Sequence, residues 1–335
     1  MISSLFRRVF KLGIWAGLIL TTIIIPSSAE KLSRPMTAAK FVVTKQTLPL
    51  GPWAKKMIVD QRLRLTGAWQ LTSTGKGFGG LSAMMLARGE LLLLSDGGAL
   101  IRLRGRPDAT ESLAVLAPLP GSCGHGWLHR ERDTESLALT PDGSGLRVGV
   151  ETSNSLCAID LANPKKEARF SIPAMQSWRK DAGAESITGL PGRAMVVIAE
   201  GGVNTGGTRP MLWFYGDPIN PATPLVTMRY LPPTGYSPTD AAFLPDGRLL
   251  VINRRFIPPF SFSAKLVLVP AFRPTTGLTV TGKLIAQIDD PAITDNYEGI
   301  AIAPAPGGST VWLVSDNNFS SFQRNLLLRF TLTDK

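Results

Sequence analysis

The sequence has few of the residues from which catalytic and metal sites are most often built. Among its 335 residues there are two cysteines and two histidines, and no Cys/His group has the spacing of a zinc site. It also lacks a Gly-x-Ser-x-Gly segment, a P-loop and a dinucleotide-binding fingerprint. These absences argue against a structural zinc domain, an α/β-hydrolase and a nucleotide-dependent enzyme.

Charge is scarce as well, since charged residues make up 18% of the chain and hydrophobic residues 44%. That balance excludes a disordered chain. No convincing amphipathic helix and no nucleic-acid-binding motif can be found. The 33 glycines and 26 prolines are spread along the whole length rather than clustered. Such a spread is typical of a protein made of many short strands joined by tight turns.

The N-terminus has the pattern of an export signal. Three basic residues lie within the first eleven, the uncharged stretch Leu12–Ile25 follows, and small residues precede and include Ala29. An uncleaved membrane anchor is the alternative, but these fourteen residues are fewer than the roughly 20 that a spanning helix needs. We therefore predict a signal peptide over 1–29, an N-terminal segment over 30–58 and one domain over 59–335.

Export predicts a periplasmic or secreted protein whose membrane contact is limited to the leader. The leader carries three basic and no acidic residues, so the mature chain has a net charge of +8. A basic surface favours a phosphorylated or otherwise anionic small molecule as ligand. We expect a monomer that binds no nucleic acid.

The two cysteines, Cys123 and Cys157, would meet an oxidising environment after export. A lone pair there is often a disulfide. Whether the two α-carbons come within bridging distance cannot be derived from the sequence. Both states, bridged and free, therefore stay open at this point.

A repeated unit organises the rest of the chain. Each copy has a small or acidic residue at the start of a short strand, a turn rich in Pro and Gly, and a strongly apolar return strand. Positions 82, 135, 185, 240 and 298 anchor the copies and lie 53, 50, 55 and 58 residues apart. The five copies cover 79–96, 133–151, 183–200, 238–254 and 297–316.

Units of about fifty residues that contain several short strands predict an all-β fold, a β-propeller. A β-sandwich would not explain why the same residue types return at the same place in every unit. Five repeats indicate five blades, and a diverged sixth built from residues 40–75 is the alternative. The last unit ends before its outer strand, so Arg62–Leu71 is expected to close that blade from the N-terminal side.

Carboxylates recur at both ends of the repeated strand pair. In an antiparallel pair the start of one strand lies beside the end of its partner, so both sets should gather at one mouth of the central channel. We predict that these acids form a group of metal ligands: Asp96, Glu135, Glu151, Glu185, Glu200, Asp240, Glu298 and Asp316.

So many like charges are costly to bring together unless cations compensate them. Oxygen ligands without Cys or His partners suit calcium or another hard divalent cation. Arg254 and Arg255 stand where other units carry an acid, and either could hold an anionic substrate group, as could His125. The alternatives are that the acids cap strand ends as a structural network and that His125 is a solvated loop residue.

Several phrases of the sequence resemble a known family. GGLSAM (79–84) with LLLLSDGG (91–98), DTESLALTPDG (133–143), NYEGIAIAP (296–304) and the segment 312–330 are similar to the bacterial family described as having an "esterase-like activity of phytase" domain. The resemblance spans roughly residues 60–335. It implies a propeller, export to the periplasm and a phosphoester or ester hydrolase activity.

Calcium-dependent propeller phytases, which the family description invokes, hold metal ions with acidic residues and phosphate with basic ones. The predicted acid group agrees with that chemistry, although Ser82 leaves it without an acid in the first unit. The sequence thus predicts a metal-assisted phosphoester or ester hydrolase. A non-catalytic propeller that binds a ligand or a protein is the alternative, because a fold does not fix a function.

Overall fold

The computed structural model describes residues 36–124, 131–163, 166–180, 182–202, 206–258 and 261–334. All of them belong to one compact unit, Arg34–Lys335. Strands dominate this unit, and its described helices are the short α2 (Trp53–Lys56), α3 (Gly121–Gly124) and 3₁₀ turn η2 (Pro173–Met175). The predicted all-β class is therefore confirmed.

The strands fall into five antiparallel series, each ordered from an inner strand outward. The first is β3 (Leu81–Ala87), β4 (Glu90–Ser95), β5 (Ala99–Arg104) and β6 (Glu111–Pro118). The second is β7 (Thr134–Leu139), β8 (Gly145–Val150), β9 (Ser155–Asp160) and β10 (Glu167–Ser171). The third is β11 (Ser186–Leu190), β12 (Ala194–Ile198), β13 (Arg209–Phe214) and β14 (Leu225–Tyr230), with β18 (Thr279–Val280) added in parallel to β14.

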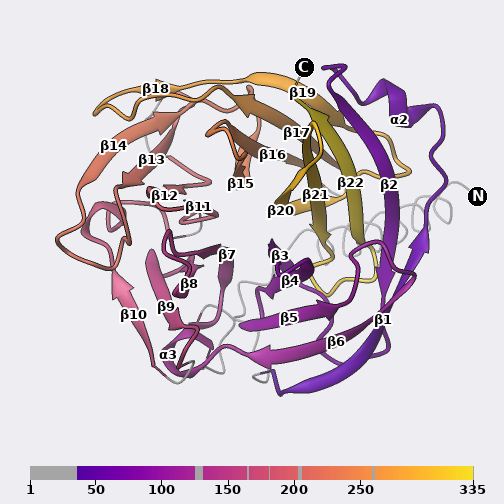
Figure 1. Ribbon diagram of the computed structural model, residues 1–335, viewed down its shortest axis with the longest axis horizontal. Coiled ribbons are helices and arrows are strands. Elements are labelled where there is room, and N and C mark those ends of the chain that lie inside the picture. Colours follow the sequence, from indigo (N-terminus) through magenta and orange to yellow (C-terminus); the bar gives the residue numbers. More distant parts are fainter. Residues whose placement is uncertain are drawn as a thin grey trace, which may run out of the picture. The chain divides into compact units, whose positions relative to one another are not determined.

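The fourth series is β15 (Ser237–Phe243), β16 (Leu249–Ile257), β17 (Ser261–Val269) and β19 (Lys283–Ile288). The fifth is β20 (Asn296–Ala305), β21 (Gly308–Asp316), β22 (Asn325–Thr333) and, from the other end of the chain, β2 (Leu63–Thr72). Each inner strand contacts the inner strand of the next series, and β20 contacts β3, so the inner strands form a closed ring (Figure 1). These series are the blades of a propeller.

Strands from the N-terminal and C-terminal parts of the described chain meet in the fifth blade. Leu63 pairs with Leu332, and the ladder between β2 and β22 continues to Leu71 and Asn325. This pairing confirms that an N-terminal strand closes the last blade. β1 (Ala39–Thr47) then pairs with both β2 and β6, which joins the fifth and first blades into one nine-stranded sheet. Residues 40–75 thus supply two outer strands of existing blades.

The apolar strands are buried because each blade packs on both neighbours. β12 is buried along its whole length, as expected for a strand with covered faces. Five hydrophobic clusters fill the spaces between consecutive blades. The one between the fourth and fifth blades, for example, includes Ile252, Leu266 and Phe330. This packing fixes the ring around the channel.

In the second and fourth blades the turn that follows the inner strand has the sequence Pro-Asp-Gly. In the second blade the Gly143 amide donates to the carbonyl of Thr140, and in the fourth the Gly247 amide donates to that of Leu244. Both glycines have positive φ, 72° and 86°, which a glycine adopts without steric cost. The turns direct the apolar second strand back along the first, so its end returns to the level where the inner strand began.

Candidate functional site

Every blade brings three equivalent positions to one mouth of the channel. The first position lies just before the inner strand or at its start. The second is the residue at the β-bulge of that strand, or the residue in the same place where the strand has no bulge. The third lies near the end of the second strand or just after it. In the second blade these are Asp133, Glu135 and Glu151; the Glu151 amide donates to the carbonyl of Asp133 at 3.0 Å, and the ladder skips Glu135 between Thr134 and Ser136. A bulge redirects its extra residue, here toward the channel mouth.

The same geometry recurs in the other blades. The ladder skips Ser82, Thr239 and Glu298, and Glu185 directly precedes β11. Beside them, Asp96 and Glu200 follow the second strands of their blades, Asp316 ends β21, and Arg254 lies within β16 opposite Ser237. We call this set the acid mouth; its carboxylates are Asp96, Asp133, Glu135, Glu151, Glu185, Glu200, Glu298 and Asp316.

The structure thus brings together seven of the eight predicted ligands, and it places Asp240 elsewhere. In the fourth blade the bulge residue is Thr239, so Asp240 lies one position further along the strand. Its carboxylate accepts the amides of Ala241 at 2.8 Å and Ile300 at 2.9 Å, which ties β15 to β20. Burial raises the pKa of Asp240 well above its usual value, while those two backbone amides oppose the shift.

Arg254 occupies the acid mouth as the sequence predicts, and it is already bonded to carboxylates. Its guanidinium donates to Glu200 Oε1 at 2.8 Å, to Glu298 Oε1 and to Asn296 Oδ1. Glu200, Arg254 and Glu298 belong to three consecutive blades, so this residue links them. Burial disfavours its charge, but Glu298 and Glu200 outweigh burial and raise the pKa of Arg254.

Arg255 lies on the other face of the same strand. It is exposed, and its guanidinium lies 5.0 Å from the centre of the Tyr236 ring, which Lys265 also approaches to 4.4 Å. A cation over an aromatic face is a common surface contact. Arg255 is thus not among the groups that contact the acid mouth carboxylates. His125, the third predicted substrate-binding residue, lies outside the described residues.

Burial and mutual repulsion raise the pKa of five acid mouth carboxylates. Burial and then the charge of Glu200 raise the pKa of Glu185 well above its usual value, and burial with Glu185 does the same for Glu135. Burial raises the pKa of Glu151 to about 8 and that of Glu298 to about 7, and in the latter Arg254 opposes the shift. Burial and then the charge of Glu298 raise the pKa of Asp316 well above its usual value. A cation bound among these carboxylates would lower their pKa values again, because an opposite charge favours the ionised form.

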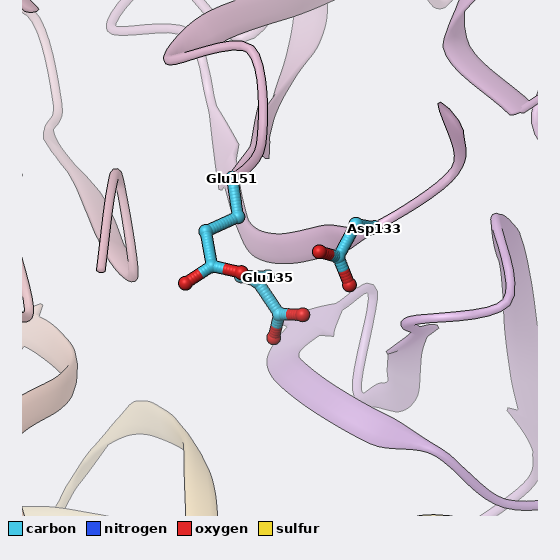
Figure 2. A group of neighbouring side chains, drawn as sticks. All are labelled: Asp133, Glu135 and Glu151. Atoms are coloured by element: carbon cyan, nitrogen blue, oxygen red, sulfur yellow. The ribbon is translucent and has the colours of Figure 1, made fainter. Parts of the chain in front are cut away.

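Two sets of three carboxylates lie close enough to share an ion. One is Asp133, Glu135 and Glu151, and the other is Glu151, Glu185 and Glu200; in each, one oxygen from every residue lies within 4.8 Å of the others. Figure 2 shows the carboxyl groups of Asp133, Glu135 and Glu151 gathered in one place. Glu151 belongs to both sets. This all-oxygen donor set fits a hard divalent cation such as calcium.

Three residues of the site do not follow from the acid pattern. Asp133 precedes the inner strand and occupies the place that Gly80 and Gly183 have in other blades. Asn296 donates from Nδ2 to Glu298 Oε1 at 2.8 Å and so orients it. Arg132 is buried, donates to the carbonyl of Gly97, and attracts Asp96. The signal for the first two was their shared place at the start of each unit.

The opposite mouth of the channel differs in shape and chemistry. Here the ends of the inner strands and their turns surround a cavity of about 850 Å³. Its lining is mainly apolar, with Leu86, Ile187, Phe243 and Ile302 among its side chains. Asp240 reaches this cavity from the wall of the channel. We call it the apolar mouth.

Cys123 and Cys157 form a disulfide, with α-carbons 5.6 Å apart. The bridge ties α3 to β9 at the junction of the first two blades. A disulfide fits a secreted protein. Within the part of the chain that the structure describes, no helix has the length and apolar character needed to cross a bilayer.

Comparison with known proteins identifies the family. The family model described as "Esterase-like activity of phytase" matches residues 76–319, which is most of the chain. The chain belongs to this phytase-like family. The matched segment includes all eight acid mouth carboxylates and Arg254. A search of curated proteins finds no match.

Solved structures give similarity at the level of the fold. The chain is 14% identical to the glutaminyl cyclase of Myxococcus xanthus, with 81% of this chain and 97% of that one covered and a TM-score of 0.44. It is 11% identical to a luciferin-regenerating enzyme, with 79% of this chain and 84% of that one covered and a TM-score of 0.42. It is also 11% identical to the β-propeller domain of Cps50 (Swd1) from Myceliophteria thermophila, with 87% of this chain and 100% of that one covered and a TM-score of 0.37. At these TM-scores none of them supports an argument about activity.

Proposed function

We propose that this protein is a metal-assisted phosphoester hydrolase that acts at the acid mouth after export to the periplasm or the cell exterior. The observation that carries the proposal is the position of Glu151 in both sets of three carboxylates. A carboxylate that belongs to two adjacent oxygen sites can bridge two hard cations. The family match supports a hydrolase of this class.

The residues of the chain divide the work by position. Asp133, Glu135, Glu151, Glu185 and Glu200 would hold calcium or a similar cation, which when bound would polarise a phosphoryl oxygen and lower the pKa of a bound water. Arg254 holds Glu200 and Glu298 in position. For Arg254 to contact a phosphate directly it would have to exchange one of these bonds.

The substrate that fits is a small anionic phosphoester bound by a monomer. The net charge of +8 on the mature chain would attract such an anion from a distance. The acid mouth would repel it unless cations were bound. We therefore expect activity to depend strictly on the metal, with carboxyl esters as the alternative substrate class that the family description names.

A non-catalytic ligand-binding propeller is the second candidate. It is favoured by the bonds of Arg254 to Glu200, Glu298 and Asn296, which tie three blades together. Such a network could serve the fold alone. In that case the acid mouth would bind cations or ligands without turnover.

The test compares Glu151→Gln with Glu90→Gln. Glu90 is an equally sized acid that pairs with Arg102 at the turn between β3 and β4, away from the acid mouth. Purified mature protein is assayed on phosphomonoesters and carboxyl esters, with calcium and with a chelator. We expect calcium-dependent phosphatase turnover that falls on the order of 100-fold in Glu151→Gln and is unchanged in Glu90→Gln.

Calcium binding is measured in parallel by calorimetry. Binding without turnover of any phosphoester would favour the non-catalytic candidate. Turnover that survives both the chelator and Glu151→Gln would overturn the metal-assisted proposal.

A further inference from the structure

The segment that follows Asp316 has an unusual backbone. Asn318 and Phe319 have φ values of 48° and 49°, and they are consecutive residues that are not glycine. This left-handed region is unfavourable for a side chain such as Phe because its Cβ crowds the backbone. Residues in such conformations persist where surrounding contacts hold them, and they concentrate at functional sites.

Hydrogen bonds hold this segment tightly. The Asn318 amide donates to Asp316 Oδ1 at 2.8 Å, and Asn317 Oδ1 accepts the amides of Gly80 at 3.0 Å and Phe319 at 3.2 Å. Asn318 Nδ2 donates to Gln323 Oε1 at 2.7 Å. Since Asp316 belongs to the acid mouth, the segment starts at the site itself and is fixed to the first blade.

The bonds position the Phe319 ring across Gly79 and Gly80. A Cβ added to Gly80 would lie 2.4 Å from Phe319 Cε2 and 2.1 Å from Asp96 Oδ1. The ring and the Asp96 carboxylate therefore flank the same glycine. Both glycines have positive φ, 140° and 60°, and lack the side chain that would displace the ring. Phe319 nevertheless remains 48% exposed.

A half-exposed aromatic ring held beside Asp96 and Asp316, two carboxylates of the acid mouth, can contact a ligand that binds there. Aromatic rings stack on other planar apolar groups. We propose that Phe319 is a specificity-determining residue that stacks on the alcohol portion of the substrate, so that the acid mouth prefers phosphoesters of aromatic alcohols to those of small aliphatic ones. This inference rests on the proposed function, because it assumes that the phosphoryl group lies at the acid mouth.

The experiment measures binding separately from turnover. Calorimetry in calcium compares phenylphosphonate with methylphosphonate, which share a head group that a phosphatase cannot hydrolyse. The variants are Phe319→Gly, Phe319→Tyr and Phe322→Ala. Glycine removes the ring but adopts a φ of 49° without cost, so the fold is retained. Phe322 is a matched control, since it lies in the same segment and is 82% exposed.

We expect the wild type to bind phenylphosphonate more tightly and Phe319→Gly to weaken that binding about 3- to 10-fold, with methylphosphonate unchanged. Phe319→Tyr should restore the preference and Phe322→Ala should leave it intact. Absence of an aryl preference in the wild type, or a preference that survives Phe319→Gly, would overturn the inference. So would failure of both phosphonates to bind. If the wild type bound phenylphosphonate more tightly than methylphosphonate but hydrolysed no phosphoester, only the proposed function would be contradicted.

Discussion

The two mouths of the channel are built by the same repeated strand pair, yet they differ in almost every chemical respect. At one mouth eight carboxylates and Arg254 meet, many of them buried. At the other, apolar side chains and Pro-Asp-Gly turns line an open cavity of about 850 Å³. One end of the pair has the strand start and strand end, and the other has the tight turn, so the repeat separates two chemistries by position alone.

Glu151 at the acid mouth and Asp142 at the apolar mouth have pKa values shifted in opposite directions. Burial raises the pKa of Glu151 to about 8 at the acid mouth. At the apolar mouth Asp142 accepts hydrogen bonds from Thr140 and from Ser144, and these lower its pKa to about 2. The difference arises because Asp142 is solvated and has donors of its own, whereas Glu151 lies among other acids. Of these two carboxylates, only Glu151 belongs to the sets whose oxygens lie close enough to share a cation.

The largest effect on stability should come from removing the Arg254 side chain, which links three blades at the acid mouth. Arg254→Ala leaves Glu200 and Glu298 without their ion pairs in a largely buried setting, and breaking such pairs costs about 3–5 kcal/mol of unfolding free energy. Arg193→Ala removes the same side chain from the apolar mouth, where it is exposed, and should cost no more than about 0.5 kcal/mol. Urea unfolding of both variants without calcium gives the comparison.

Addition of Glu298→Gln to Arg254→Ala should recover part of the loss, since one unpaired acid is then neutral. Equal costs for Arg254→Ala and Arg193→Ala would show that Arg254 does not hold the acid mouth together.

The second effect concerns pH. A carboxyl whose folded pKa is raised binds more protons in the folded than in the unfolded chain, so its stabilising contribution is present at low pH and lost as pH rises. For Glu298, raised from 4.5 to about 7, the loss is roughly 3 kcal/mol between those values. The calcium-free protein should therefore be more stable near pH 5 than near pH 8.

Thermal unfolding at several pH values checks this sign. Glu298→Gln should flatten the pH dependence, and calcium should raise the melting temperature more at pH 8 than at pH 5, because a larger fraction of the acids is ionised at pH 8. Asp142→Asn at the apolar mouth should leave the dependence between pH 5 and 8 unchanged, because its pKa lies far below. A stability that rises from pH 5 to 8 without calcium would contradict the burial of these charges.

The sequence predicted the acid mouth well because the strand pair repeats with its polar ends in constant places. Seven of the eight predicted acids, and Arg254, lie there for that reason. The error in placement at Asp240 has a specific cause, since aligning acid with acid ignored the bulge at Thr239. A shift of one residue reverses the direction of a strand side chain, and a bulge leaves no mark in an apolar pattern.

Other features depend on contacts that no local pattern records. Asp133 reaches the site from just before the inner strand, and Arg132 is buried against Gly97 from the preceding blade. The strained backbone at Phe319 lies two residues after Asn317, whose side chain accepts a bond from the amide of Gly80, 237 residues before Asn317 in the chain. Distances of this kind emerge only when the blades close into a ring.

The smallest expected effect is the change in calcium affinity when Asp240, which lies outside the acid mouth, is substituted. Asp240→Ala would leave the amides of Ala241 and Ile300 without their acceptor, and each buried unsatisfied group costs about 1–3 kcal/mol. Asp240→Asn keeps one acceptor oxygen and should cost less. Because neither variant touches the ligand sets around Glu151, calcium affinity measured by calorimetry should change less than about twofold, within the accuracy of additive sites.

Glu185→Gln is the matched comparison, since Glu185 is equally buried but belongs to a ligand set. It should lower calcium affinity while relieving repulsion, and so should not reduce the stability of the calcium-free protein. If Asp240→Asn lowered calcium affinity as much as Glu185→Gln, then the residues that determine calcium binding would extend along the channel from the acid mouth to Asp240. The two mouths would in that case form one continuous site, and the separation that the strand repeat imposes would be structural without being functional.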